Sequence, residues 1–313
     1  MTRHRQINPI ITIFIQKEAY FLKNYFTDFT ETRIRTDEET GEVLSQTTIT
    51  AEQRRARRAN YEKKLQNDMD NEEVKQIRKR YGIFVWLLYN TNQVLDWGIK
   101  DEDVAKLIFI STYMNYDNRL MTSSDLVMNA KTMQQLLKVS DRTFERFIKS
   151  ITDAKILFID NKGCYCLNEE MFLRGKLENR DYDHSVSIMK LYANGIRKLY
   201  QNAKIYDHRL LAYLFRAIPF VNINYNMLCH NPEQSVLKFI KPMLFSEYCK
   251  KIGYSTDNER RLKNKLKKLR IDGSPVFNFV ENDDGRFCYI NPYVYYGGNQ
   301  HSKVMVLGEF EKK

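Results

Sequence analysis

The chain has 313 residues, enough for two domains of ordinary size, and its hydrophobic fraction of 43% and aromatic fraction of 13% exclude a disordered chain. No apolar run reaches the about 18 residues of a membrane-spanning helix, and no signal peptide is evident, so we expect a cytoplasmic protein without a membrane partner. The net charge of +11 favours a polyanionic partner, with nucleic acid ahead of an anionic membrane surface.

Residues 1–98 are predicted to form an extension. Its first 50 residues contain short β-rich runs, and residues 39–42 are typical of a hairpin turn. Thr50 and Gln53 have capping-box spacing and open a basic helix over 51–80. This helix is either a solvated surface helix or an arm along a phosphate backbone, and the second interpretation rests on four crowded arginines: Arg54, Arg55, Arg57 and Arg58. The apolar stretch 81–98 is predicted to be a core element.

Residues 99–178 predict a first structural unit. A helix begins at Asp101, a second helix covers 129–139, and a third begins at Ser140. The third helix has an apolar stripe that consists of Phe144, Phe147, Ile148 and Ile151. Its basic residues lie on the opposite face. Two short strands around the turn 161–163 follow it. Helix, helix, turn, helix and hairpin is the order of a winged helix-turn-helix domain.

Residues 179–300 predict a second unit with the same order. A linker helix over 187–200 leads into a helical stretch at 207–222 and a helix that ends at Gly253. The next helix, 258–271, buries Leu262, Leu266 and Leu269, and the hairpin after it turns at residues 284 and 285. The chain would therefore contain the same unit twice, as a degenerate internal repeat.

The predicted fold class is α+β, mainly helical, with tandem winged helix-turn-helix domains behind an N-terminal β-rich and long-helix extension. The predicted domains are the extension (1–98), winged helix 1 (99–178), a linker helix with winged helix 2 (179–300) and a C-terminal tail (301–313).

The helix at 258–271 carries the strongest functional signal. Between residues 250 and 270 there are nine basic and two acidic residues, although like charges at helical spacing repel one another. A DNA duplex would neutralise them: Arg can grip guanine, Asn can grip adenine, and Lys can hold phosphates. A solvated basic helix is the alternative. For the helix at 140–156, a protein-contact or dimerisation surface is an equal alternative.

We predict DNA contacts on both helices and on both hairpins. The predicted residues are Arg142, Thr143, Arg146, Lys149, Lys162, Arg260, Arg261, Lys263, Asn264, Lys267, Lys268 and Arg286.

The sequence predicts no catalytic residue, no cofactor and no metal site, and hence no enzyme. It contains no Gly-rich phosphate loop and no paired His-x-His. Five cysteines without a Cys-x-x-Cys spacing are typical of reduced, partly buried thiols.

Residues 131–157, 240–269 and 287–298 together resemble the two-winged-helix replication initiators of plasmids and phages and related phage DNA-binding proteins. The resemblance covers roughly residues 100–300, and residues 1–98 have no counterpart in it. It implies binding to repeats near a replication origin, or repression of the protein's own promoter, in a bacterial host cytoplasm.

The sequence therefore predicts sequence-specific binding of double-stranded DNA, with replication initiation as the role that the resemblance implies. A phage or mobile-element transcription regulator is one alternative. A protein-interaction module that binds replication, transcription or virion proteins, or a second copy of the chain, is another.

Overall fold

The structure is a computed structural model that describes residues 31–36, 43–50, 82–91, 95–122, 126–175, 186–204, 207–282 and 285–310, together with residue 93 and individual positions between 52 and 79. The chain divides into two compact units, Met1–Asn71 and Glu72–Lys313. Among the described residues, no helix is both long enough and apolar enough to cross a bilayer.

The first unit contains a two-stranded antiparallel sheet. Strand β1 (Glu31–Thr36) pairs with β2 (Val43–Ile49), which confirms the two predicted strands, while the turn at 39–42 lies outside the described residues. The capping box is also confirmed. The backbone N–H of Thr50 donates to Gln53 Oε1, and the backbone N–H of Gln53 donates to Thr50 Oγ1, both over 3.2 Å.

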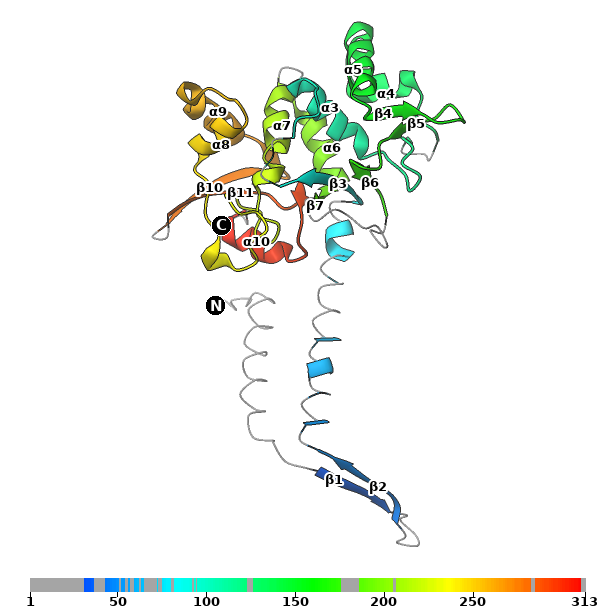
Figure 1. The fold of residues 1–313 in the computed structure, drawn as a ribbon, viewed down its shortest axis with the longest axis vertical. Helices are drawn as coiled ribbons and strands as arrows, with labels where there is room; N and C mark the ends of the chain where they lie inside the picture. The colour runs from blue at the N-terminus through cyan, green and yellow to red at the C-terminus, as the bar shows by residue number, and fades with distance from the viewer. Residues whose placement is uncertain are drawn as a thin grey trace, which may run out of the picture. The chain divides into compact units, whose positions relative to one another are not determined.

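The second unit has two successive halves (Figure 1). The first half contains β3 (Phe84–Asn90), α3 (Asp101–Ser111), α4 (Ala130–Leu137), α5 (Asp141–Asp153), β4 (Leu157–Ile159), β5 (Tyr165–Leu167) and β6 (Phe172–Leu173). The second half contains β7 (Val186–Tyr192), α6 (Ala193–Asn202), α7 (His208–Phe215), η2 (Ile218–Phe220), η3 (Leu237–Phe239), α8 (Phe245–Lys251), η4 (Thr256–Asn258), α9 (Glu259–Leu266), β8 (Arg270–Ile271), β9 (Ser274–Pro275), β10 (Phe277–Asn282), β11 (Gly285–Ile290), β12 (Tyr295–Tyr296) and α10 (His301–Leu307).

A four-stranded sheet joins the two halves. Its strand order is β12-β7-β3-β6, and β3 and β7 are antiparallel, with Trp86 opposite Lys190. Each half begins with a central strand and returns to the same sheet with a short outer strand: β6 pairs with β3, and β12 pairs with β7. This symmetric order is consistent with an internal repeat.

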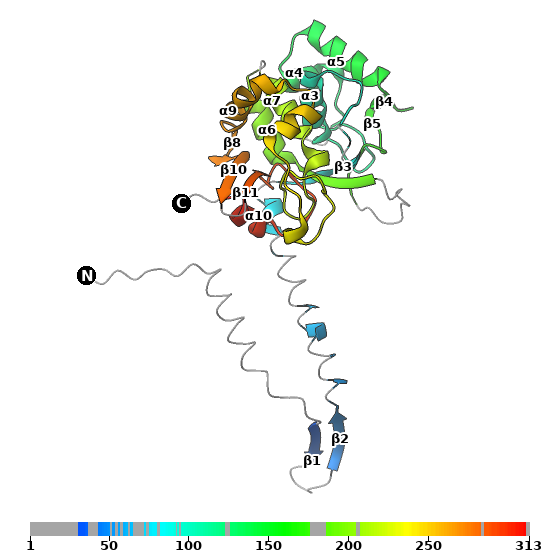
Figure 2. The same ribbon diagram turned by 60° about the vertical axis from the view of Figure 1, so that its left-hand side comes forward.

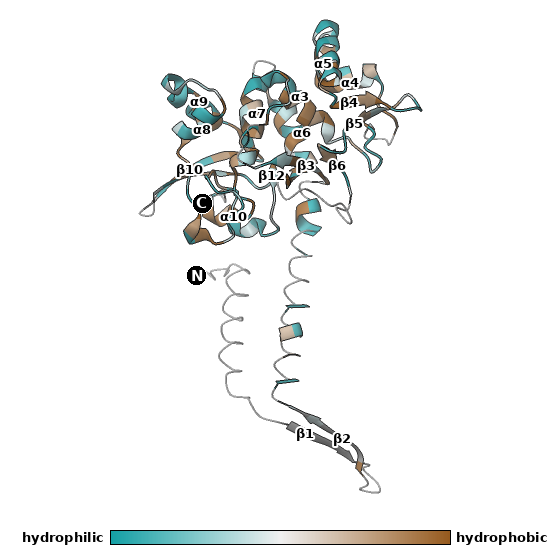
Figure 3. Cartoon of the chain, in the orientation of Figure 1, coloured by the Kyte–Doolittle hydropathy of each residue, from teal (hydrophilic) through white to brown (hydrophobic). Residues whose placement is uncertain are grey.

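One hydrophobic core runs through both halves. It includes side chains from the central strands, such as Leu87 and Leu191, and from helices of both halves, such as Phe147 and Phe215. Helices α3, α6 and α7 lie on one side of the sheet (Figures 1 and 2). Most of α3 is buried, and in Figure 3 the central strands and helices are browner than the outward helices α5 and α9. The most apolar segments therefore lie at the centre of the unit.

The predicted fold class is wrong. The described residues combine helices with five small antiparallel sheets and about 23% strand, so the fold is mixed and not mainly helical. The two halves also share one sheet and one core, where the prediction had tandem winged helix-turn-helix domains. The physical reason is that β3 and β7 satisfy each other's backbone groups, so neither half is closed by itself.

Part of the predicted linker helix is a strand. Residues 187–200 were expected to be helical, but the helix α6 begins only at Ala193, and β7 occupies Val186–Tyr192. The reason is that residues 186–192 pair with β3, a contact between segments about a hundred residues apart that the local pattern does not contain. The Lys190 side chain on β7 is buried, with 8% exposed.

In the described part of the second unit, the other predicted helices and hairpins occur near their expected positions, whereas much of the helix expected over 51–80 lies outside the described residues. The helix expected at 258–271 is shorter, because η4 precedes α9 and α9 ends at Leu266. Strand β3, which the predicted domains place in the extension, is central in the sheet of the second unit. The division after residue 71 does not test the boundaries at 98/99 and 178/179, which stay predictions.

Candidate nucleic-acid interface

Helix α8 and the turn after it position α9. Gly253 ends α8 in the left-handed region, with φ +69°, as its place in the sequence predicted. At the other end of α8, the Glu247 carboxylate accepts from the backbone N–H of Leu244 over 2.8 Å. The buried Tyr248 hydroxyl donates to the Tyr213 carbonyl and ties α8 to α7. The start of α9 is therefore held against the core.

Helix α9 has one buried side and a cationic outer side. Leu262 and Leu266 are buried, whereas Leu269 is only half-buried after the helix ends. The exposed residues on and just after the helix are Arg260, Arg261, Asn264, Lys265, Lys267 and Lys268. None of these cations forms an ion pair with a carboxylate in the part of the chain that the structure describes. Their charge is therefore open to an external anion.

A hollow of about 560 Å³ separates α9 from the hairpin β10–β11. Lys263 and Lys267 line it, and their Nζ atoms lie 4.6 and 5.4 Å from the centre of the Phe279 ring. Both lysines thus lean toward the hairpin, while the row Arg260, Asn264 and Lys268 faces solvent. The predicted contacts on this helix divide into an outer row and a pair in the hollow.

Arg286 lies at the rim of the same hollow. Its Nε donates to Glu281 Oε1 over 2.9 Å, and both side chains are largely exposed. Because an exposed pair of this kind is weak, a phosphate can compete for the guanidinium. Asp283 and Asp284, which adjoin Arg286 in the sequence, lie outside the described residues.

Helix α5 is supported by α4 in the first half. The side chain of Asn129 caps α4, accepting from the backbone N–H of Thr132 over 2.9 Å. Lys138 reverses the chain with φ +53°. The α5 face that packs on the core carries Phe144, Phe147 and Ile151. The predicted contact residues Arg142, Arg146 and Lys149 are exposed, and Thr143 is half-buried and accepts from the Ser140 hydroxyl over 3.1 Å.

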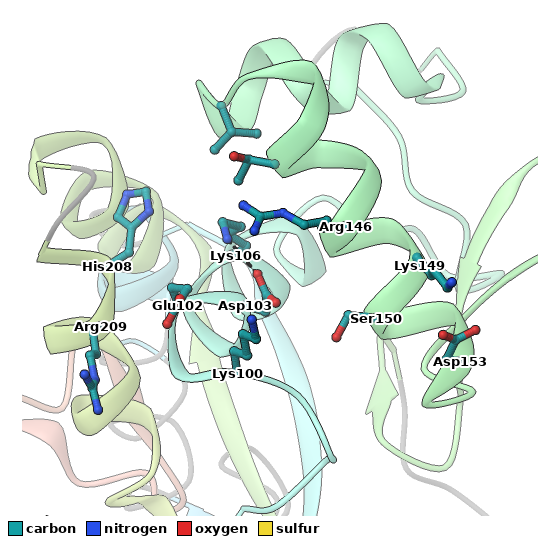
Figure 4. A pocket seen from close by; sticks show the side chains of 12 residues that line it. Lys100, Glu102, Asp103, Lys106, Arg146, Lys149, Ser150, Asp153, His208 and Arg209 are labelled. Carbon is teal, nitrogen blue, oxygen red and sulfur yellow. Dashed lines mark hydrogen bonds and ion pairs between the residues drawn. The ribbon is translucent and has the colours of Figure 1, made fainter.

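A second hollow, of about 610 Å³, lies between α5, α3 and α7 (Figure 4). Figure 4 shows Arg146 reaching from α5 toward Lys106 of α3. At the bottom, Lys106 and Asp103 form a buried ion pair over 2.6 Å. Burial, and then the charge of Lys106, lower the pKa of His208 to about 4, so this imidazole is neutral at pH 7.

Lys162 is exposed at the tip of the first hairpin, and hydrogen bonds to Asp160 order the turn there. The carboxylate of Asp160 accepts from the backbone N–H groups of Cys164 and Lys162 and from Arg119 Nε. The bond from Cys164 and the contacts of Arg119 and Lys162 hold the pKa of Asp160 at about 2. The turn that presents Lys162 is thus ordered by local hydrogen bonds.

The sequence missed several residues around these hollows. Phe279 supports the two lysines of α9, and Lys100 and Arg209 line the hollow beside α5. Lys100 directly precedes the Asp101 helix start, a signal that was available. Arg209 lines the same hollow as α5 only because α7 packs on α3. The arginine arm, Arg54, Arg55, Arg57 and Arg58, lies outside the described residues.

The described residues contain no cluster of three His, Cys, Asp or Glu side chains that would hold a metal. All five cysteines are buried thiols. Burial raises the pKa of Cys229 to about 12 and that of Cys249 to about 11, which makes both thiols unreactive at neutral pH.

No family model, no curated protein and no solved structure matches this chain.

Proposed function

We propose that the protein binds double-stranded DNA in a sequence-specific manner, with α9 as its main reading helix and α5 as a second one. The observation that carries this proposal is the set of cations on α9 that have no described carboxylate partner, next to a hollow lined by Lys263 and Lys267. A helix with a neighbouring hairpin can enter the major groove of DNA, and the hollow between helix and hairpin can then hold phosphates of the DNA backbone.

Repulsion within α9 supports a polyanionic partner. Lys263 and Lys267 lie at i,i+4 spacing, and so do Arg261 and Lys265. Like charges at this spacing cost a few tenths of a kcal/mol, about 0.2–0.5 kcal/mol per pair. A duplex would remove this cost and release counterions, which makes binding steeply dependent on salt.

The division of the α9 side chains assigns them different roles. Arg260, Arg261 and Asn264 point outward and suit base edges, because Arg can bond guanine and Asn can bond adenine in two-pronged fashion. Lys263 and Lys267 lie in the hollow and suit phosphates. The first group would supply selectivity and the second would supply affinity.

For the biological role we propose replication initiation, on the resemblance in residues 131–157, 240–269 and 287–298. Footprinting on the DNA that flanks the gene tests this role. Iterated protected repeats are expected; a single protected operator over a promoter would instead make the protein a transcription regulator.

The experiment that tests DNA binding compares two double variants. We expect Lys263→Ala/Lys267→Ala to weaken binding to every duplex and to lower the slope of log K against log salt by about 0.9 for each phosphate that is no longer neutralised. We expect Arg260→Ala/Arg261→Ala to reduce the preference for the specific site, since each good base contact is worth roughly 1–3 kcal/mol, about 5- to 150-fold. Fluorescence anisotropy with the footprinted duplex and a scrambled duplex measures both effects.

Lys238→Ala/Lys241→Ala is the matched control, because it removes the same charge from exposed positions outside both hollows. Circular dichroism checks that each variant is folded. Wild-type affinity and salt slope in Lys263→Ala/Lys267→Ala, together with an unchanged site preference in Arg260→Ala/Arg261→Ala, would show that α9 does not bind DNA.

A further inference from the structure

The hollow beside α5 has walls outside the helix-turn-helix segment. Lys100, just before α3, and Arg209, on α7, line it opposite Arg146 and Lys149 of α5 (Figure 4). Lys100 forms no ion pair with any described carboxylate. Arg209 shares Asp101 with Arg216, at 3.2 and 3.0 Å. Both walls of the hollow therefore carry positive charge.

The floor of the hollow is electrically balanced. Lys106 is neutralised by Asp103, and His208 is uncharged and stacked on Tyr200, with ring centres 4.3 Å apart. Glu102 and Asp153 are the remaining carboxylates that line it, against four cations, of which Arg209 is paired with Asp101. The lining therefore keeps a net positive charge that an anion could neutralise.

The hollow also lies between the two candidate reading helices. Both views place α3 and α7 between α5 and α9 (Figures 1 and 2), and α7 contacts α9 as well as α3. An anion in the hollow would therefore lie on a path from one helix to the other. A DNA strand could follow this path from α5 to α9, because its phosphates are spaced continuously along the strand.

We infer that the hollow between α5, α3 and α7 binds the phosphates of one DNA strand, and that Lys100 and Arg209 are DNA contacts outside the helix-turn-helix segments. This inference rests on the proposed function. The duplex would be held across the segment between its two reading helices, and α7, which belongs to the second half, would contribute to the site of the first.

The test uses full-length Lys100→Gln and Arg209→Gln, each of which removes one charge. Arg209→Gln leaves Asp101 paired with Arg216. We expect each variant to bind the footprinted duplex about 3- to 10-fold more weakly, with a salt slope lower by about 0.9 for each phosphate that the removed charge had neutralised. Hydroxyl-radical footprinting should show reduced protection of the DNA between the segments that α5 and α9 contact, and unchanged protection within those two segments.

Lys241→Gln is the control, because Lys241 is an exposed lysine just after η3 and lines neither hollow. Unchanged affinity, salt slope and footprint in both variants would overturn the inference. The proposed function would still stand in that case if Lys263→Ala/Lys267→Ala weakens DNA binding. ATP and inorganic phosphate are tested as separate ligands. Saturable ATP binding that Lys100→Gln abolishes, with DNA binding intact, would assign the hollow to a free nucleotide and overturn the inference.

Discussion

At the scale of single residues, the second half contains two basic side chains buried in unusual surroundings. His301 is 2% exposed and is enclosed by the rings of Tyr192, Tyr293 and Tyr296. Lys190 is buried nearby, donating to the Gly298 carbonyl and the Asn299 side chain over 2.7 and 2.5 Å. Burial, and then the charge of Arg78, lower the pKa of Lys190 to about 8. Exclusion of water disfavours the charged form of both side chains, so His301 is neutral at pH 7, whereas Lys190 keeps its proton.

His301 predicts a loss of stability in acid. Burial, and then the charge of Lys190, lower its folded-state pKa to about 3, against 6.5 in the unfolded chain. Below pH 6.5 the unfolded state takes up a proton that the folded state refuses, so the free energy of unfolding falls as the pH falls toward 3, by up to about 1.4 kcal/mol per pH unit. His301→Leu should reduce this slope. Urea unfolding between pH 7 and 4 measures it.

His208 gives that experiment an internal comparison. Its folded-state pKa is also lowered, to about 4, so it contributes a slope of the same sign over a narrower range. His208→Leu should therefore also reduce the slope of the free energy of unfolding against pH, and the double variant should reduce it more than either single variant. An unchanged slope in His301→Leu would show that this imidazole is not neutral in the folded protein.

At the scale of elements, the helix caps explain why α4 and α5 could be predicted. Asn129 caps α4 through a hydrogen bond to the backbone N–H of Thr132, and its residue type is favoured at this position. Ser140 precedes α5 at the equivalent position, but its hydroxyl bonds Thr143 Oγ1 and does not cap the helix backbone. The same residue preference therefore marks both starts, although only one side chain makes the capping bond.

This difference predicts unequal effects of two similar substitutions. Asn129→Ala should lower the free energy of unfolding by about 1 kcal/mol, because it leaves the first turn of α4 without its acceptor. Ser140→Ala is the matched control and should cost clearly less. Denaturant unfolding of both variants measures the difference; equal losses would contradict the assignment of the cap.

At the scale of the whole molecule, the shared sheet predicts that both halves of the second unit unfold together. Strand β3 comes from the first half and β7 from the second, and their side chains enter the same core. Two buried thiols report on the halves separately, Cys166 on β5 and Cys288 on β11. If the core is cooperative, both thiols should become reactive with the same free energy.

Leu87→Ala tests this cooperativity. Leu87 is fully buried in β3, so its truncation should cost about 2–5 kcal/mol. Thiol labelling with mass spectrometry should show the same loss of protection at Cys166 and Cys288. Leu237→Ala, at an exposed position of η3, is the control and should change neither. Loss of protection at Cys166 alone would mean that the halves are independent.

The sequence by itself determined the local features of this protein. The capping box at Thr50 and Gln53, the turn at Gly253 and the apolar stripes of α5 and α9 depend on neighbours within a few residues, so their pattern is complete in the sequence. The cationic side of α9 was predictable for the same reason.

Only the tertiary structure decided the fold class and the surroundings of the candidate site. Strand β7 contains Lys190, whose burial depends on pairing with β3 about a hundred residues earlier in the chain, and no local pattern contains that information. Likewise, Phe279 meets Lys263, and Arg209 lines the same hollow as α5, only because separate segments pack together. Sequence patterns report contacts along the chain, whereas the shared sheet and both hollows arise from contacts across it.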